Sequence, residues 1–184
     1  MRKQNIICRK VNIMRRVAKF EKVSFEQFKK DMENYREFIS EEKIIEAYKE
    51  LKLPTRATKG SAGYDFYAPI NLSLKADSTS KPIPTGIRCK MEDDVVLMIY
   101  LRSGLGFKYG ISLANTTGVI DSDYYNAKNE GHIMVKFKNP GEELVLEKGS
   151  AMMQGIFIPY YITEDDNVST ERVGGFGSTD KKPK

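Results

Sequence analysis

The spacing of hydrophobic residues changes near Pro54. Before it, apolar residues recur every three or four positions over residues 24–37, which predicts an amphipathic helix carrying Phe25, Phe28, Met32 and Tyr35 on one face. Ser24 followed by Gln27 three residues later is a capping-box pattern, and it predicts where this helix begins. A second helix is expected after Ser40, which two acidic residues follow, and it ends at Pro54.

After Pro54 the hydrophobic pattern alternates over short stretches separated by Gly, Pro, Asn and Asp. The stretches have the length of β-strands and no helical spacing competes with them; they read IPTGIRC, VVLMIYL, GISLAN, HIMVKFKN, ELVLE and AMMQGIFIPYY. We therefore predict an all-β body over residues 55–163. A strand, indicated by weak alternation over residues 17–23, and the helical hairpin occupy residues 14–54. A flexible glycine-rich tail is expected over residues 164–184.

Composition limits the chemistry that this chain performs. At 184 residues it is about one domain. Cys8 and Cys89 lie far apart and His132 is the only histidine, which leaves almost no material for zinc sites or for Cys-His and Ser-His nucleophiles. Catalysis is expected from carboxylates, hydroxyls, arginines and backbone amides. No apolar run approaches the roughly 18 residues that cross a bilayer and no signal-peptide core follows the basic N-terminus, so we expect a cytoplasmic protein with no membrane partner.

The net charge of +5 is concentrated at the start of the chain. The first 20 residues contain seven basic residues and no acid, so the remaining 164 carry a net charge of −2. Aromatic interleaving is absent there and no nucleic-acid-binding motif follows, so nucleic acid is not an expected partner. Residues 1–13 form a basic extension. Met14 offers an alternative start, and the pattern leaves open whether residues 1–13 are native or extra translated sequence.

Several stretches combine glycine with groups that bind phosphate. Arg102 and Ser103 precede glycines in LRSGLGFKYG. The glycine-rich ERVGGFGSTDKK contains Arg172, Ser178 and Thr179. Exposed backbone amides, hydroxyls and guanidinium groups are the donors needed around a polyphosphate, although each stretch alone is also an ordinary turn. The G-x-x-x-x-G-K-[ST] spacing of a P-loop is absent, so a polyphosphate site must be assembled from separate segments.

Five stretches in order along the chain resemble the motifs of the trimeric deoxyuridine triphosphatases (dUTPases): AGYDFYA, RSGLG, GVIDSDY, GSAMMQGIF and GGFGST. The resemblance runs from about Leu53 to Thr179 and leaves the helical hairpin outside it. It implies a jelly-roll-like β barrel that forms a homotrimer, with active sites shared between subunits. It also implies that dUTP is hydrolysed with Mg²⁺ to dUMP and pyrophosphate, which limits uracil in DNA and supplies dUMP for thymidylate synthesis.

The resemblance also implies a role for individual residues. Asp121 matches the carboxylate that activates the attacking water, and Tyr124 matches the aromatic residue that packs under deoxyribose and excludes a 2′-hydroxyl. Asn115 and Gly118 lie on the hairpin that reads uracil, and Asp65 matches a carboxylate that reaches Mg²⁺ through water. The residues matched to phosphate binding are Arg102, Ser103, Gly104 and Gln154. The tail residues matched to closure over the nucleotide are Arg172, Phe176, Gly177, Ser178 and Thr179.

The sequence departs from the family pattern at three places. Leu101 stands where a proline usually precedes the motif arginine. The tight Y-x-G after the catalytic segment is replaced by YYNAKNEG, so that Gly131 comes seven residues after Tyr124 and a longer loop is expected. The tail is one residue shorter between its arginine and the glycines, and Asp180 replaces a glycine. We expect Asp180 to weaken closure of the tail slightly unless it points to solvent.

If the extended geometry continues past Asp121, strand periodicity predicts that Asp121 and Asp123 point to opposite faces, so they are not expected to form an acid/base pair. Two other functions remain open. The related dCTP deaminases carry a glutamate where this chain has Lys136, and a charged lysine cannot accept the proton of the attacking water. A nucleotide-gated binding or regulatory module is the other alternative. The helical hairpin over residues 24–51 would then bind a partner, rather than cover the open end of the β body.

Overall fold

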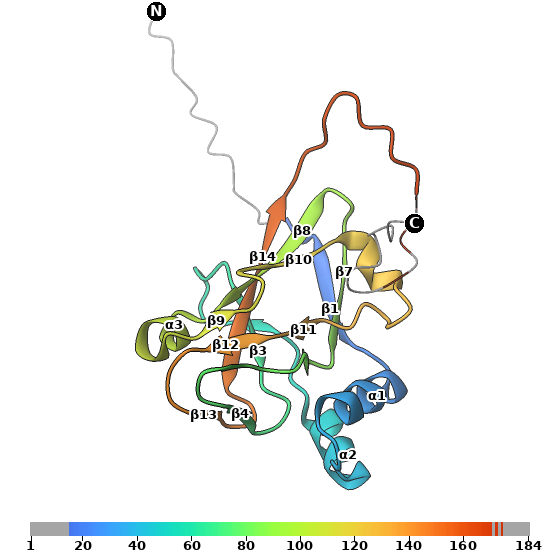
Figure 1. The fold of residues 1–184 in the computed structure, drawn as a ribbon. Helices are drawn as coiled ribbons and strands as arrows, with labels where there is room; N and C mark the ends of the chain where they lie inside the picture. Colours follow the sequence, from blue (N-terminus) through green and yellow to red (C-terminus); the bar gives the residue numbers. More distant parts are fainter. Residues whose placement is uncertain (1–14, 171, 173, 175–184) are drawn as a thin grey trace, which may run out of the picture.

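The computed structural model describes residues 15–170, 172 and 174 of the chain. Within them the fold is mostly β, with short helices, which confirms the predicted fold class (Figure 1). The N-terminal part consists of β1 (Ala18–Lys22), α1 (Phe25–Tyr35) and α2 (Glu41–Glu50). The elements that follow are β2 (Thr55–Arg56), β3 (Tyr64–Tyr67), β4 (Leu72–Leu74), β5 (Ser78–Thr79), β6 (Ile83–Pro84), β7 (Ile87–Met91), β8 (Val95–Leu101), α3 (Ser103–Tyr109), β9 (Ser112–Leu113), β10 (Gly118–Ile120), η1 (Ser122–Asn126), β11 (Met134–Val135), β12 (Phe137–Asn139), β13 (Leu144–Leu146) and β14 (Ala151–Pro159).

A five-stranded antiparallel sheet organises the body, with strand order β10-β8-β14-β3-β2. Alternate residues of β8 are buried, as its VVLMIYL pattern predicts, and Leu97 is fully covered. Four smaller antiparallel groups complete the β structure: β1-β7, β6-β11, β4-β13 and β5-β12-β9. Because β8 pairs with both β10 and β14, it links most of the segments that carry the family motifs.

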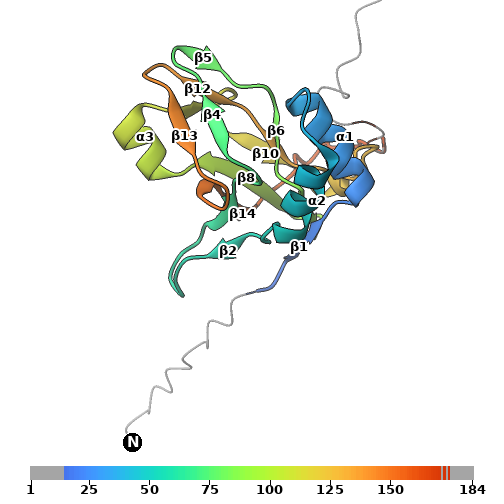
Figure 2. The same ribbon diagram turned by 90° about the horizontal axis from the view of Figure 1, so that it is seen from below.

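The N-terminal strand and hairpin pack against the β body. β1 pairs with β7 along its full length, from Ala18 opposite Met91 to Lys22 opposite Ile87. Both helices lie on one side of the β strands (Figure 2), and their apolar faces join the same core through the fully buried Phe28, Met32 and Ile44. The predicted strand and the two predicted helices are therefore confirmed.

The start of α1 differs from a complete capping box. The Ser24 hydroxyl accepts a hydrogen bond from the Gln27 amide at 3.1 Å, as expected. The Gln27 side chain does not return to the Ser24 amide, because its Nε2 donates to Asp31 Oδ2 at 2.7 Å. Glu130, more than 100 residues away, instead accepts from the Ser24 amide at 2.7 Å.

One short helix, α3, interrupts the predicted β body. This helix ends at Gly110, whose φ of +66° suits glycine, and the Gly110 amide donates to the Gly106 carbonyl at 3.0 Å. Two glycines inside the helix lower its intrinsic propensity, and Leu105 is its only buried residue. Such a short segment has no hydrophobic period that could reveal it.

None of the helices in the described part of the chain combines the length and the apolar character that crossing a membrane requires.

Candidate active site

Residues from three motifs meet where β3, β8 and β14 lie side by side. Asp65 on β3 and Gln154 on β14 are directly opposite each other in the ladder, and Arg102 directly follows β8. Gly63, next to this pair, leaves space that the Gln154 side chain fills. We refer to Asp65, Arg102, Ser103 and Gln154 as the Arg102 cluster.

The Arg102 cluster combines a buried acid with an exposed helix start. Asp65 is 8% exposed and forms an ion pair with Arg102 Nη1. Gln154 Nε2 donates to the carbonyl of Leu101 at 3.3 Å, which ties β14 to the end of β8. Ser103 and Gly104 are exposed in the first turn of α3, and the Arg102 side chain makes no capping hydrogen bond there. First-turn amides of a helix lack intrahelical acceptors, so this end of β8 presents donors to an anion.

Asp121 and Tyr124 lie at the other end of β8. Asp121 follows β10 as the cap residue of η1, the single 3₁₀ segment in the described residues. Tyr124 lies within η1 and is 5% exposed. Its hydroxyl donates to the carbonyl of His132 at 2.9 Å and accepts from Asn129 Nδ2 at 2.8 Å. The longer loop that the sequence predicts after Tyr124 therefore folds back and hydrogen-bonds to it.

The two aspartates do not point to opposite faces, so this prediction is wrong. Arg172 contacts both of them: Nη2 donates to Asp121 Oδ2, and Nε donates to Asp123 Oδ1 at 2.8 Å. The extended geometry ends at Ser122, where η1 begins, and a 3₁₀ turn does not alternate its side chains. The guanidinium also lies 5.8 Å from the ring centroid of Tyr124. Arg172 therefore joins the two acids and the tyrosine within one chain.

The electrostatics of Asp121 suit a proton acceptor. Burial raises the pKa of the Asp121 carboxyl; the charge of Arg172 opposes this rise and the charge of Asp123 adds to it. A raised pKa makes the ionised carboxylate a stronger proton acceptor. Burial also raises the pKa of the Tyr124 hydroxyl, which keeps this group protonated.

The Arg102 cluster and Asp121 are well separated within one chain. Ile120 on β10 pairs with Leu97 on β8, and this register, continued by one residue, places Asp121 level with Val96. Arg102 comes six residues after Val96 along the same strand. At about 3.3 Å per residue, roughly 20 Å separate the two positions. A single nucleotide phosphate therefore cannot contact Asp121 and Arg102 of the same chain.

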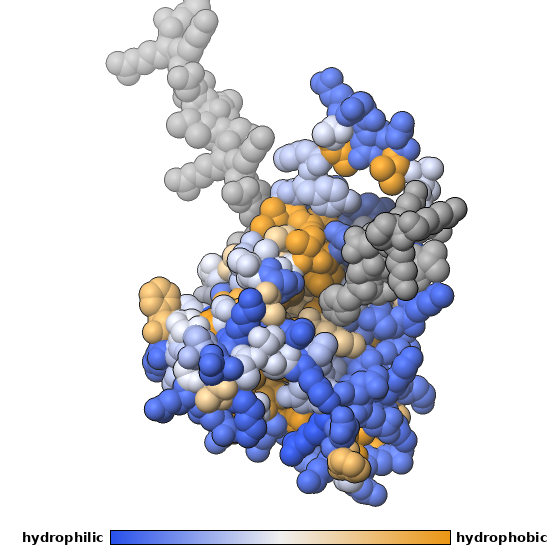
Figure 3. All heavy atoms as spheres, in the orientation of Figure 1, coloured by the Kyte–Doolittle hydropathy of each residue, from blue (hydrophilic) through white to orange (hydrophobic). Residues whose placement is uncertain are grey.

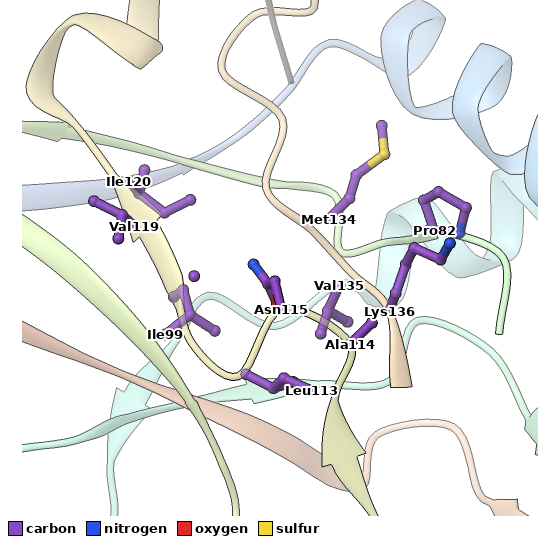
Figure 4. A pocket seen from close by; sticks show the side chains of 11 residues that line it. Pro82, Ile99, Leu113, Ala114, Asn115, Val119, Ile120, Met134, Val135 and Lys136 are labelled. Atoms are coloured by element: carbon purple, nitrogen blue, oxygen red, sulfur yellow. The ribbon is translucent and has the colours of Figure 1, made fainter. Parts of the chain in front are cut away.

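A cavity of about 460 Å³ opens beside the segment that connects β9 and β10, and Asn115 extends into it between Val119 and Met134 (Figure 4). Its volume suits a small ligand. Gly118 belongs to its wall, and a Cβ at that position would lie 3.1 Å from Cβ of Ile99, so glycine permits the close approach of β10 to β8. Lys136 lies at the rim of the cavity with an exposed side chain.

A buried polar pair, which the sequence pattern does not indicate, lies behind Tyr124. His132 is fully buried and its Nδ1 lies 2.6 Å from Oδ2 of Asp31, which is 9% exposed. The two residues are 101 positions apart, and no local pattern relates them. A lone histidine in an apolar stretch is therefore a structural residue here.

Four predicted tail residues, Phe176, Gly177, Ser178 and Thr179, lie outside the described residues, as does Asp180. Within the described part, no group of three or more His, Cys, Asp or Glu side chains is arranged to hold a metal ion. The acidic residue of the Arg102 cluster is Asp65. A lone carboxylate beside phosphate-binding donors fits Mg²⁺, which keeps several waters and binds through substrate phosphates.

The sequence and the fold of the chain are similar to those of known proteins. The family model described as dUTPase matches residues 49–180. The deoxyuridine 5′-triphosphate nucleotidohydrolase of Lactococcus lactis is 42% identical over 142 residues, 74% of this chain and 94% of the relative. That of Escherichia coli is 36% identical, over 73% of this chain and 91% of the relative. The crystal structure of dUTPase from Streptococcus mutans superposes with a TM-score of 0.60 at 33% identity, covering 79% of this chain and 98% of that one.

Proposed function

The chain belongs to the dUTPase family, the nucleotidohydrolases of deoxyuridine 5′-triphosphate, and we propose that it cleaves dUTP to dUMP and pyrophosphate by water attack on the α-phosphorus. Asp121 is the general base in this proposal. The observation that carries it is the position of Asp121, partly buried at the end of β10 with a raised pKa and within reach of an arginine. A fixed carboxylate of this kind accepts a proton from water as the water attacks.

The remaining residues bind and orient the substrate. Arg102, Ser103 and Gly104 supply a guanidinium, a hydroxyl and backbone amides to the phosphates, and Gln154 holds the end of β8 in place. Phosphoryl transfer asks a protein mainly for positioning and for neutralisation of charge, which these groups provide. Mg²⁺, held by the substrate phosphates and by Asp65 through water, would add further charge neutralisation. Arg172 is expected to leave the two aspartates and bind phosphate when the tail closes.

We infer that each active site is shared between subunits of a homotrimer. The separation of roughly 20 Å between Asp121 and Arg102 supports this inference, because only a second chain brings the two groups to one nucleotide. An apolar row on the sheet supports it as well: Val119, Met98 and Ile156 are adjacent across β10, β8 and β14. Val119 is 57% exposed, and apolar side chains gather over these strands (Figure 3). Exposed apolar patches of this kind mark surfaces that a partner covers.

Selectivity follows from the cavity beside Asn115 and from Tyr124. The segment that connects β9 and β10 is proposed to bind uracil largely through its backbone, so that cytosine leaves buried polar groups unpaired. The close approach of β10 to β8 at Gly118 leaves little room for the 5-methyl of thymine. Tyr124 packs under the sugar and excludes a 2′-hydroxyl. In a cell this activity would limit uracil in DNA and supply dUMP.

Product analysis tests the proposal. Purified protein is incubated with Mg²⁺ and dUTP, dCTP, dTTP or UTP, and the products are separated by anion-exchange chromatography. We expect equal amounts of dUMP and pyrophosphate from dUTP and at least about 100-fold less from the other three, because cytosine leaves polar groups unpaired and the 5-methyl and the 2′-hydroxyl are excluded sterically. dUTP or dUMP formed from dCTP would instead identify a deaminase. Absence of any product would identify a binding module.

A further inference from the structure

β1 and α1, which we call the N-terminal unit, form hydrogen bonds with the loop that follows the proposed catalytic segment. Glu21 of β1 accepts a hydrogen bond from the Tyr125 hydroxyl at 2.7 Å. The Ser24 hydroxyl, at the start of α1, donates to Glu130 Oε1 at 2.6 Å, while its amide donates to Oε2. These contacts and the buried pair of α1 with His132 fall within residues 125–132, which we call the brace loop. The brace loop contains the residues that replace the family's tight turn.

The contact to His132 is the most buried of the three and has a defined direction. The backbone amide of Gly86 donates to His132 Nε2 at 2.7 Å. Because an amide N–H can only donate, Nε2 carries no proton and the ring proton resides on Nδ1. Nδ1 therefore donates to Asp31 Oδ2 at 2.6 Å. Asp31 fixes both the tautomer and the orientation of the ring.

The same residue holds Tyr124 through its backbone. The carbonyl of His132 accepts the hydrogen bond from the Tyr124 hydroxyl, so the ring that is proposed to lie under the sugar is positioned by the far end of the brace loop. Glu130 and Gly131 next to it both have positive φ, +57° and +68°. A non-glycine residue in this region is strained, and surrounding contacts must hold it there. The bidentate contact of Glu130 with Ser24 supplies such a contact.

We propose that Asp31 of the helical hairpin is a positioning residue for dUTP hydrolysis, which holds Tyr124 through His132 and thereby sets the discrimination between deoxyribose and ribose. The inference rests on the proposed function, since Tyr124 is assigned to the sugar there. It gives the helical hairpin a role in the active site of its own chain. The residues that make these polar contacts with the brace loop are Glu21 of β1, Ser24 at the start of α1 and Asp31 of α1. None of the three lies on α2.

Three variants separate positioning from simple loss of stability. Asp31→Ala leaves the buried Nδ1–H of His132 without its acceptor. Asp31→Asn keeps the volume and an acceptor oxygen. Ile44→Ala is the matched control, because it removes a fully buried side chain from α2 and touches none of the three polar contacts. For each variant we compare the ratio of kcat/KM for dUTP to that for UTP, together with hydrogen exchange of the peptide covering residues 122–135.

We expect Asp31→Ala to lower the dUTP/UTP ratio by at least about fivefold, as loss of one buried hydrogen bond predicts, and to speed exchange of the peptide. Asp31→Asn should remain within about twofold of the unaltered protein, because it restores the acceptor. Ile44→Ala should lower the melting temperature and leave the ratio unchanged. A folded Asp31→Ala variant with an unaltered ratio and unaltered exchange would overturn the inference.

A second site keeps the test decisive if Asp31→Ala does not fold. Glu130→Ala removes the contact with Ser24 from the brace loop, where the side chain is only partly buried. It should change the ratio and the exchange in the same direction as Asp31→Ala, and the inference is wrong if it changes neither. If the unaltered protein releases no pyrophosphate from dUTP, the proposed function fails; the exchange data still decide whether Asp31 holds the brace loop.

Discussion

The two ends of β8 place their functional residues by different means. At the Leu101 end, Asp65 and Gln154 lie on paired strands and face each other in register, so backbone pairing places them together. At the Val95 end, Asp121 and Tyr124 lie after the strand, in a 3₁₀ turn. Tyr124 is held there by hydrogen bonds with the brace loop, which β1 and α1 contact in turn, and Asp121 is bound by Arg172.

The difference shows which part of the site tolerates change. A ladder of backbone hydrogen bonds holds residues at fixed positions whatever their side chains are, whereas a turn is held by a few specific contacts. We therefore expect alterations near the Arg102 cluster to act on substrate binding. Alterations near Asp121 should act on both the local fold and the chemical step.

The largest expected effect comes from removing one functional group at each end. Asp121→Asn should lower kcat by about 10²–10⁴-fold, the usual contribution of a general base, with little change in binding of a non-hydrolysable dUTP analogue. Arg102→Ala should mainly weaken that binding. Chains of the two variants, mixed during refolding, should regain part of the activity, because a shared site can take Asp121 from one chain and Arg102 from another.

Steady-state kinetics and calorimetry on each variant and on the mixture check this expectation. A mixture of two Asp121→Asn preparations is the control and should stay inactive. Failure of the mixed chains to recover any activity, although mixed oligomers have formed, would contradict the shared site.

A smaller effect is expected from adding one methyl group at each end. Gly131 has a φ of +68°, and a Cβ there would lie 2.7 Å from the carbonyl oxygen of Tyr124. Gly131→Ala should therefore lower the free energy of unfolding by about 2–3 kcal/mol, the combined cost of left-handed strain and backbone crowding. At Gly104 in α3 a Cβ meets no atom within 4 Å. Gly104→Ala should leave the stability unchanged or raise it by up to about 1 kcal/mol, because alanine favours a helix.

Urea unfolding of both glycine variants provides the measurement. Equal losses of stability at the two positions would show that the ends of β8 do not differ in the way described.

The smallest effect is a shift in pH dependence. The negative charge of Asp123 contributes to the raised pKa of Asp121, so Asp123→Asn should lower that pKa. A general base must be deprotonated, so the acid limb of the kcat/KM profile should move to lower pH. Arg172→Gln should move the limb the opposite way, because the arginine lowers the pKa of Asp121. If the acid limb stays at the same pH in both variants, Asp121 is not the group whose ionisation the kcat/KM profile reports.

The sequence predicted the regular elements well, because their hydrophobic spacing is local. Phe28 and Met32 recur at helical distance, and the alternation in β8 reports one buried face. The contact between Asp31 and His132 could not be predicted, because it joins residues 101 positions apart. Sequence distance also explains the difference at the start of α1. The local pattern predicts that Gln27 accepts from the Ser24 amide, whereas the acceptor is the distant Glu130.

Site residues on strands were easier to foresee than residues on turns. Gln154 lies on β14, a strand that the hydrophobic alternation predicts, and Asp65 pairs with it from β3. Asp121 and Asp123 were expected on opposite faces because strand geometry was continued past Ile120, where η1 begins instead. Strand periodicity gives no information once the backbone leaves the extended region.

The buried contact between Asp31 and His132 has a consequence for engineering. The hairpin and the brace loop must be transferred together when segments are exchanged between proteins. A chimera that receives the loop without the hairpin buries His132 Nδ1–H without an acceptor. A chimera that receives the hairpin alone deprives the buried Asp31 of its partner His132 and leaves it the hydrogen bond from Gln27. Recombination with a relative that lacks both segments should therefore yield a stable protein only when residues 18–51 and 125–132 are transferred together.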